Sequence, residues 1–166
     1  MDNEVVKKIV ESVAREMAQF NFSERHNDIA SSIAGVVKKS WNPLRRIFGG
    51  HGIAAVVVVP ESVTDRVGLK VFFQGVRKEI NSRFVGVAAY KSSYSFIVLL
   101  CPHNLFAACP EVASELKDRT GLHMNIIQGV ILVNSDTREV TGDYTRPSLH
   151  KREYEAVLAA TSRAVK

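Results

Sequence analysis

One stretch of this chain, residues 38–51, combines residue types that recognise phosphate groups. It holds four cations and no acidic residue: Lys38, Lys39, Arg45 and Arg46. Lysine and arginine neutralise phosphate charges, and an exposed indole such as that of Trp41 can stack on a nucleobase. The pattern predicts a surface for an anionic partner. In the alternative interpretation, Trp41 packs inward and the cations only solvate a connecting segment.

A second basic group lies near the carboxyl end of the chain. Residues 144–152 contain Arg146, Lys151 and Arg152 and no acidic residue. A helix is expected to begin here, and cations in its first turn oppose the helix dipole, which favours negative charge at that end. This mismatch also suggests an anionic partner. The predicted binding residues come from both groups: Lys38, Lys39, Trp41, Arg45, Arg46, Lys151 and Arg152.

Soft metal ligands occur at Cys101, His103 and Cys109. Zinc sites normally use four ligands with a recognisable spacing, and only three are close together in this sequence. A cysteine–histidine nucleophile also requires an orienting acid, which no neighbouring residue supplies. We therefore expect two buried free thiols rather than a disulfide, a metal site or a catalytic pair.

Four polar residues could hold a hard cation for phosphodiester hydrolysis: His123, Asp136, Glu139 and Asp143. However, Asp136 and Asp143 also suit turns, and Glu139 suits a solvent-facing edge strand. Turn chemistry is the simpler explanation of this group. We therefore expect no metal and no cofactor, and phosphodiester hydrolysis stays an alternative function.

The composition is that of a globular domain. The chain has 166 residues, 46% of them apolar, and a formal net charge of +5. A chain of this length usually forms one domain and needs no disulfide or metal to fold. The longest apolar run, residues 53–59, is too short to span a bilayer, and residues 1–4 lack the basic start of a secretory signal. We therefore expect a cytoplasmic protein.

The elements that must position the basic residues begin with helices. Apolar residues recur every three or four positions over residues 6–20, which is typical of a helix with one buried face. A second helix, ended by Pro43, is predicted by the same spacing at Ile29, Ile33, Val36 and Val37.

The rest of the chain predicts a sheet with further helices. Residues 53–59, rich in β-branched side chains, predict a strand that is covered on both faces. Residues 62–82 fit a helix better than a strand, because their apolar positions keep a helical spacing. Two hairpins are expected within 84–100 and 130–141, since three residues separate the strand-like runs of each pair.

Helices that begin near Pro110 and Ser148 complete the order α-α-β-α-β-β-α-β-β-α. This order contains β-α-β-β-α-β, the order of a ferredoxin-like unit. We predict a single α+β domain over residues 1–166. A helical part at 1–48, with two N-terminal helices, precedes a mixed, mostly antiparallel sheet of about five strands at 52–166, which ends in a C-terminal helix.

The predicted function is that of a non-catalytic cytoplasmic protein that binds or regulates through a basic surface. Its partner would be nucleic acid or an acidic protein, not a membrane. The first alternative is an accessory subunit that docks on a partner, or on a second copy, through its amphipathic N-terminal helices. The second is a small phosphodiester hydrolase, and an enzyme is the less favoured possibility.

Overall fold

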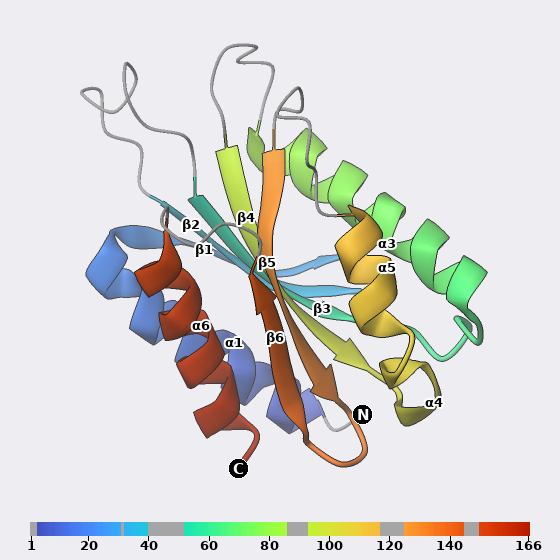
Figure 1. Ribbon diagram of the computed structural model, residues 1–166. Coiled ribbons are helices and arrows are strands. Elements are labelled where there is room, and N and C mark those ends of the chain that lie inside the picture. Colours follow the sequence, from blue (N-terminus) through green and yellow to red (C-terminus); the bar gives the residue numbers. More distant parts are fainter. Residues whose placement is uncertain (1–2, 31, 40–51, 86–92, 117–124, 145–149) are drawn as a thin grey trace.

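In the residues that it describes, the computed structural model places six strands in one open, mixed sheet with helices on both faces (Figure 1). The sheet runs in sequence order: β1 (Phe22–Ala30), β2 (Ile33–Lys39), β3 (Gly52–Val58), β4 (Ser93–Cys101), β5 (Asn125–Asn134) and β6 (Val140–Tyr144). The structure describes residues 3–30, 32–39, 52–85, 93–116, 125–144 and 150–166.

The direction of the strands changes along the sheet. β1, β2 and β3 form an antiparallel meander, β3, β4 and β5 are parallel, and β6 returns antiparallel to β5. The parallel strands are joined by helical crossovers, α3 (Arg66–Ile80) and α5 (Cys109–Leu116), with the short α4 (His103–Phe106) before α5. We call the end where β3, β4 and β5 begin the amino end of the sheet, and the opposite end the carboxyl end. β2 and β6 finish at the amino end.

The two faces of the sheet have separate cores. Helices α1 (Asn3–Met17) and α6 (Lys151–Ala164) cover one face, and α3, α4 and α5 cover the other (Figure 1). The apolar side of α1 is buried in its own chain: Val5, Val6, Ile9, Val10, Val13 and Met17. The face with which an accessory subunit would dock is thus already packed. None of the described helices is long and apolar enough to cross a membrane.

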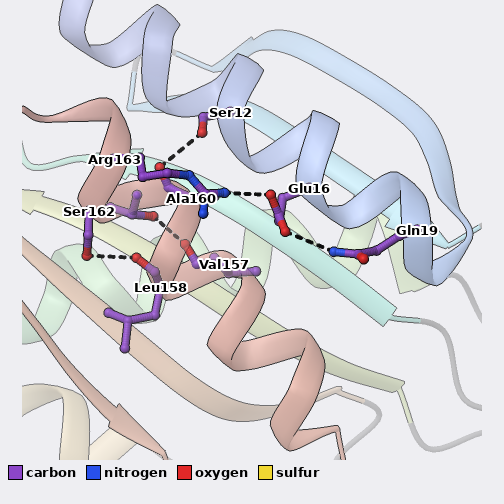
Figure 2. Close-up of polar contacts among 9 residues, drawn as sticks. Ser12, Glu16, Gln19, Val157, Leu158, Ala160, Ser162 and Arg163 are labelled. Atoms are coloured by element: carbon purple, nitrogen blue, oxygen red, sulfur yellow. Dashed lines mark hydrogen bonds and ion pairs between the residues drawn. The ribbon is translucent and has the colours of Figure 1, made fainter.

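Helices α1 and α6 lie side by side and are joined by polar contacts (Figure 2). Ser12 Oγ donates to the carbonyl oxygen of Ala160 at 3.0 Å. The Arg163 guanidinium lies 2.5 Å from Glu16, which also accepts from Gln19 at 2.9 Å. Exposed ion pairs contribute little, so the apolar faces supply most of the stabilisation between the two helices.

Several predicted elements are confirmed. The strand expected at 53–59 is β3, which is buried at almost every position, as a strand covered on both faces should be. The helices expected over 6–20 and 62–82 correspond to α1, extended by a 3-10 turn at Ala18–Phe20, and to α3. The pairing of β5 with β6 confirms the second hairpin.

The second N-terminal helix is wrong, because β1 and β2 occupy that stretch. β2 is rich in β-branched residues and contains Gly35, which costs about 1 kcal/mol in a helix. A Cβ at Gly35 would lie 2.6 Å from Val10 Cγ1, so glycine allows α1 to approach the strand closely. Since β2 is covered on both faces, it lacks the alternation that marks a strand, and its apolar spacing matches a helix by coincidence.

Of the first expected hairpin, the structure describes the second strand, which is β4. Residues Asn81–Val85 form a π-helical turn after α3, and 86–92 lie outside the described residues. The described strands and crossovers follow the order β-β-β-α-β-α-β-β, which differs from the ferredoxin-like order, and they number six rather than about five. Pro110 lies in the first turn of α5, whereas Ser148 falls outside the described part of the chain.

Cys101 and Cys109 are fully buried in the core beneath α3 and α5. β4 ends at Cys101, and α4 turns the chain back so that Cys109 faces the end of that strand. The structure pairs the two as a disulfide, with 2.50 Å between the sulfur atoms. This pairing differs from the two free thiols that the sequence favours.

Candidate functional site

At the amino end of the sheet, Lys39 of the first basic group lies beside the first turn of α6, where the second basic group ends. Lys39, at the end of β2, places its Nζ 2.6 Å from Oε1 of Glu153 in the first turn of α6. Glu153 directly follows Lys151 and Arg152. An ion pair therefore joins the last residue of β2 to the basic start of α6.

Tyr94, at the start of β4, extends this ion pair into a network. Its hydroxyl donates to Glu153 Oε2 at 2.6 Å and accepts from Lys39 Nζ at 2.9 Å. The His150 ring lies 3.3 Å from the same carboxylate oxygen and stacks on the Tyr94 ring, with 3.6 Å between the centroids. Gly52 leaves space for this arrangement, because a Cβ there would lie 2.7 Å from the Tyr94 hydroxyl oxygen.

The network holds Glu153 in its ionised form. Burial alone raises the pKa of this carboxyl, but hydrogen bonds from His150, Lys39 and Tyr94, with the charge of Lys39, outweigh burial and lower the pKa below its ordinary value. The side chains of Lys39 and Glu153 are only 13% and 10% exposed. The charge of Lys39 is therefore neutralised within the protein, which makes this lysine a poor phosphate ligand.

The other predicted binding residues differ in how their charges are balanced. Lys38 lies 3.6 Å from Glu24, and Lys151 lies 3.6 Å from Glu155. Arg152 is exposed and has no ion pair within the described part of the chain. The remaining three predicted residues lie outside the described residues: Trp41, Arg45 and Arg46.

Four stretches of the chain that lie outside the described residues connect to strands at this same end: 40–51, 86–92, 117–124 and 145–149. The first and the last of them belong to the two basic groups. The strand ends to which they connect are neighbours in the sheet, since Gly52 pairs with Tyr94 and Ser93 pairs with Asn125. By sequence, these four stretches hold six lysines and arginines and a single aspartate. Their net charge of +5 equals that of the whole chain, so the rest of the chain is formally neutral.

A smaller polar group at the carboxyl end surrounds Asn134, a buried residue that the sequence analysis missed. Its Oδ1 accepts the backbone N–H groups of Asp136 at 3.0 Å and Thr137 at 3.2 Å, so its Nδ2 faces Nδ1 of His103 at 3.0 Å. This orientation makes Nδ1 the acceptor and leaves the proton of a neutral His103 on Nε2. An asparagine between an apolar strand and a Ser-Asp-Thr turn is the sequence signal that could have identified it.

The residues considered for hydrolysis are not gathered into a catalytic group in the described part of the chain. Asp136 accepts from the backbone N–H of His103 at 3.0 Å rather than from its ring. Glu139 directly precedes β6 and Asp143 lies within it, while His123 lies outside the described residues. Among the residues described, no three His, Cys, Asp or Glu side chains could hold a metal ion.

The chain matches no protein-family model, no curated protein and no solved structure.

Proposed function

We propose that this protein binds single-stranded nucleic acid at the amino end of its sheet and is not an enzyme. The distribution of charge carries the proposal. The four stretches that connect to strands at this end hold a net charge of +5, and the remainder of the chain is formally neutral. A local concentration of cations attracts a phosphate backbone and gains affinity from the release of its counterions.

Aromatic residues favour nucleic acid over an acidic protein surface. Trp41, Phe48 and Tyr90 belong to the same four stretches as the cations. Single-stranded nucleic acid is bound by cations that contact the backbone and by aromatic rings on which bases stack. An acidic protein surface would use the cations but does not require aromatic rings beside them.

The Lys39–Glu153–Tyr94 network supports this end of the sheet rather than contacting the ligand. It joins the end of β2, the start of β4 and the first turn of α6 through hydrogen bonds of 2.6 to 2.9 Å. Lys39 and His150, which border the stretches 40–51 and 145–149 in the sequence, both contact Glu153 in this network. In this proposal Arg45, Arg46 and Arg152 bind phosphate, and Lys39 has a positioning role.

Fluorescence anisotropy with a labelled single-stranded oligonucleotide of about 16 nucleotides tests the proposal. The double variant Arg45→Ala/Arg46→Ala should bind at least about tenfold more weakly and should reduce the slope of log K against log salt by about 1 to 2. The matched control is Arg66→Ala/Lys70→Ala on the outer side of α3. It removes the same charge from residues that are paired with Glu115, and it should leave the affinity unchanged.

Three results would overturn the proposal. The first is no binding of the oligonucleotide to the wild-type protein at low salt. The second is an equal loss of affinity in the two double variants, which would indicate an effect of net charge alone. The third is binding of polyglutamate as tightly as the oligonucleotide, which would identify an acidic protein as the partner.

A further inference from the structure

A cavity of about 930 Å³ opens on the α1 face of the sheet, toward the carboxyl end and away from the proposed nucleic-acid site. It lies between the first half of α1, the edge strand β1 and the ends of β3 and β4. Its volume is in the range of small-molecule sites, and the carboxyl ends of parallel strands are a common place for such sites. The turn after β5 closes one side through Ser135 and Asp136.

The floor of the cavity is apolar. Side chains from α1, β2, β3 and β4 form it: Val6, Val10, Ala34, Val58 and Leu100. Gly35 brings α1 close to β2 at Val10, so the helix and sheet meet there. A ligand in this space would place an apolar body against the floor and lose contact with water.

The rim of the cavity carries both signs of charge. Lys7 and Arg25 supply cations from α1 and β1, while carboxylates come from Glu11 of α1 and from Glu61 and Asp136, which follow β3 and β5. Lys7 and Glu61 are exposed and make no ion pair within the described part of the chain. Arg25 is oriented by the bond from its Nε to Asn27 Oδ1 at 3.0 Å.

We propose that this cavity binds a small zwitterion with an apolar body, of the size of an amino acid or a dipeptide. Its carboxylate would meet Lys7 and Arg25, and its ammonium group would meet Glu61 and Asp136. A ligand with one sign of charge pairs with only part of the rim and is therefore bound more weakly. The cavity and the proposed nucleic-acid site lie at opposite ends of the sheet and share no residue.

Three probes with the same apolar body test the charge requirement: Leu-Leu, its N-acetyl derivative and its C-terminal amide. Each is titrated into the full-length, ¹⁵N-labelled protein, and amide shifts are followed by NMR. Leu-Leu should shift amides of Val58, Leu100 and Ser135 and should bind at least about tenfold more tightly than either blocked probe. No shift at these amides with millimolar Leu-Leu, or equal affinity for all three probes, would overturn the proposal.

Variants locate the binding within the cavity. Ala34→Leu fills the floor and should abolish the shifts, and unchanged binding by a folded Ala34→Leu protein would contradict the assignment. Lys7→Ala should weaken the binding of Leu-Leu by about tenfold, because Lys7 contacts the carboxylate of the ligand. The affinity for the C-terminal amide probe, which lacks that carboxylate, should not change. Lys8→Ala is the matched control, since Lys8 is exposed on the same helix and does not line the cavity. If Lys7→Ala and Lys8→Ala change the affinity for Leu-Leu equally, the ligand does not bind in this cavity. This comparison does not depend on whether Ala34→Leu folds.

Discussion

Lys39 and Glu153 form an ion pair that is largely buried. Removing a charged pair from water costs several kcal/mol, which is repaid only when the geometry is good and the remaining polar atoms are bonded. Here both oxygens of Glu153 are used, one by Lys39 and one by Tyr94, and the His150 ring lies beside the second. Loss of one partner would leave the other charge buried without compensation.

We expect Glu153→Gln to lower the free energy of unfolding by about 3 kcal/mol at pH 7, because it leaves the Lys39 ammonium buried without its carboxylate. The matched control is Glu155→Gln, on the same helix, where an exposed carboxylate lies 3.6 Å from Lys151. Glu155→Gln should lower the free energy of unfolding by less than about 0.5 kcal/mol. Urea denaturation of both variants provides the comparison, and equal losses would contradict a special role for the network.

The same residue predicts part of the response to acid. The pKa of Glu153 is lowered in the folded protein from its ordinary value of 4.5. A group with a depressed pKa stabilises the folded state fully above the unfolded value and loses that contribution as the pH falls through the folded value. The free energy of unfolding of the wild-type protein should therefore fall more steeply below pH 4.5 than that of Glu153→Gln. Urea denaturation at several acidic pH values measures both, and the same pH dependence in the two proteins would show that Glu153 does not contribute to the acid response.

At the scale of elements, two glycines determine how closely α6 packs on the sheet. A Cβ at Gly129 of β5 would lie 2.5 Å from Cδ2 of Tyr154, and a Cβ at Gly142 of β6 would collide with the hydroxyl of the same tyrosine. The Tyr154 ring therefore lies close against two adjacent strands, where it also stacks on Tyr144 with 4.9 Å between centroids. α6 can bury its apolar side only because these positions have no side chain.

Gly129→Ala should therefore destabilise the protein by about 1 to 3 kcal/mol, since the added methyl group displaces the buried ring of Tyr154. Gly75→Ala is the opposite case. It lies inside α3, where a Cβ meets nothing within 4 Å, and alanine is favoured over glycine in a helix by about 1 kcal/mol. Thermal denaturation should show a lower melting temperature for the first variant and a higher one for the second. A shift of the same sign in both would contradict the packing argument.

At the scale of the whole molecule, stability should be greatest in the centre of the sheet and least at the β1 edge. β3 and β4 are buried on both faces, between the two cores. β1 is an edge strand with exposed charged residues, and its register with β2 is interrupted at two places. Charges and irregular pairing at an edge also disfavour pairing with another chain.

Native-state hydrogen exchange should show this gradient. Amides of Ala54–Val57 and Ile97–Leu100 should exchange most slowly, because they open only with global unfolding. Amides of Ser23–Asn27 should exchange faster, since local fraying of the edge exposes them. Equal protection in β1 and β4 would show that the sheet opens as one unit.

Much of the architecture and charge of this protein follows from the sequence by itself. The amphipathic spacing of α1 and α3 and the β-branched run of β3 depend on neighbours in the chain, so their patterns survive in the sequence. The two acid-free groups around Lys39 and Lys151 are visible in the same way, as is the turn at Asp136. Each of these features is local.

Only the tertiary structure decided the rest. β2 became a strand because β1 and β3 pair with it and both of its faces are covered, which removed the alternation that would have identified it. Glu153 met Lys39 because the sheet brought the end of β2 to the first turn of α6, 114 residues later in the chain. The cavity beside Lys7 likewise needs α1, β3 and β4 together. Such contacts join residues far apart in the chain, and no local pattern of residue types specifies which of them will meet.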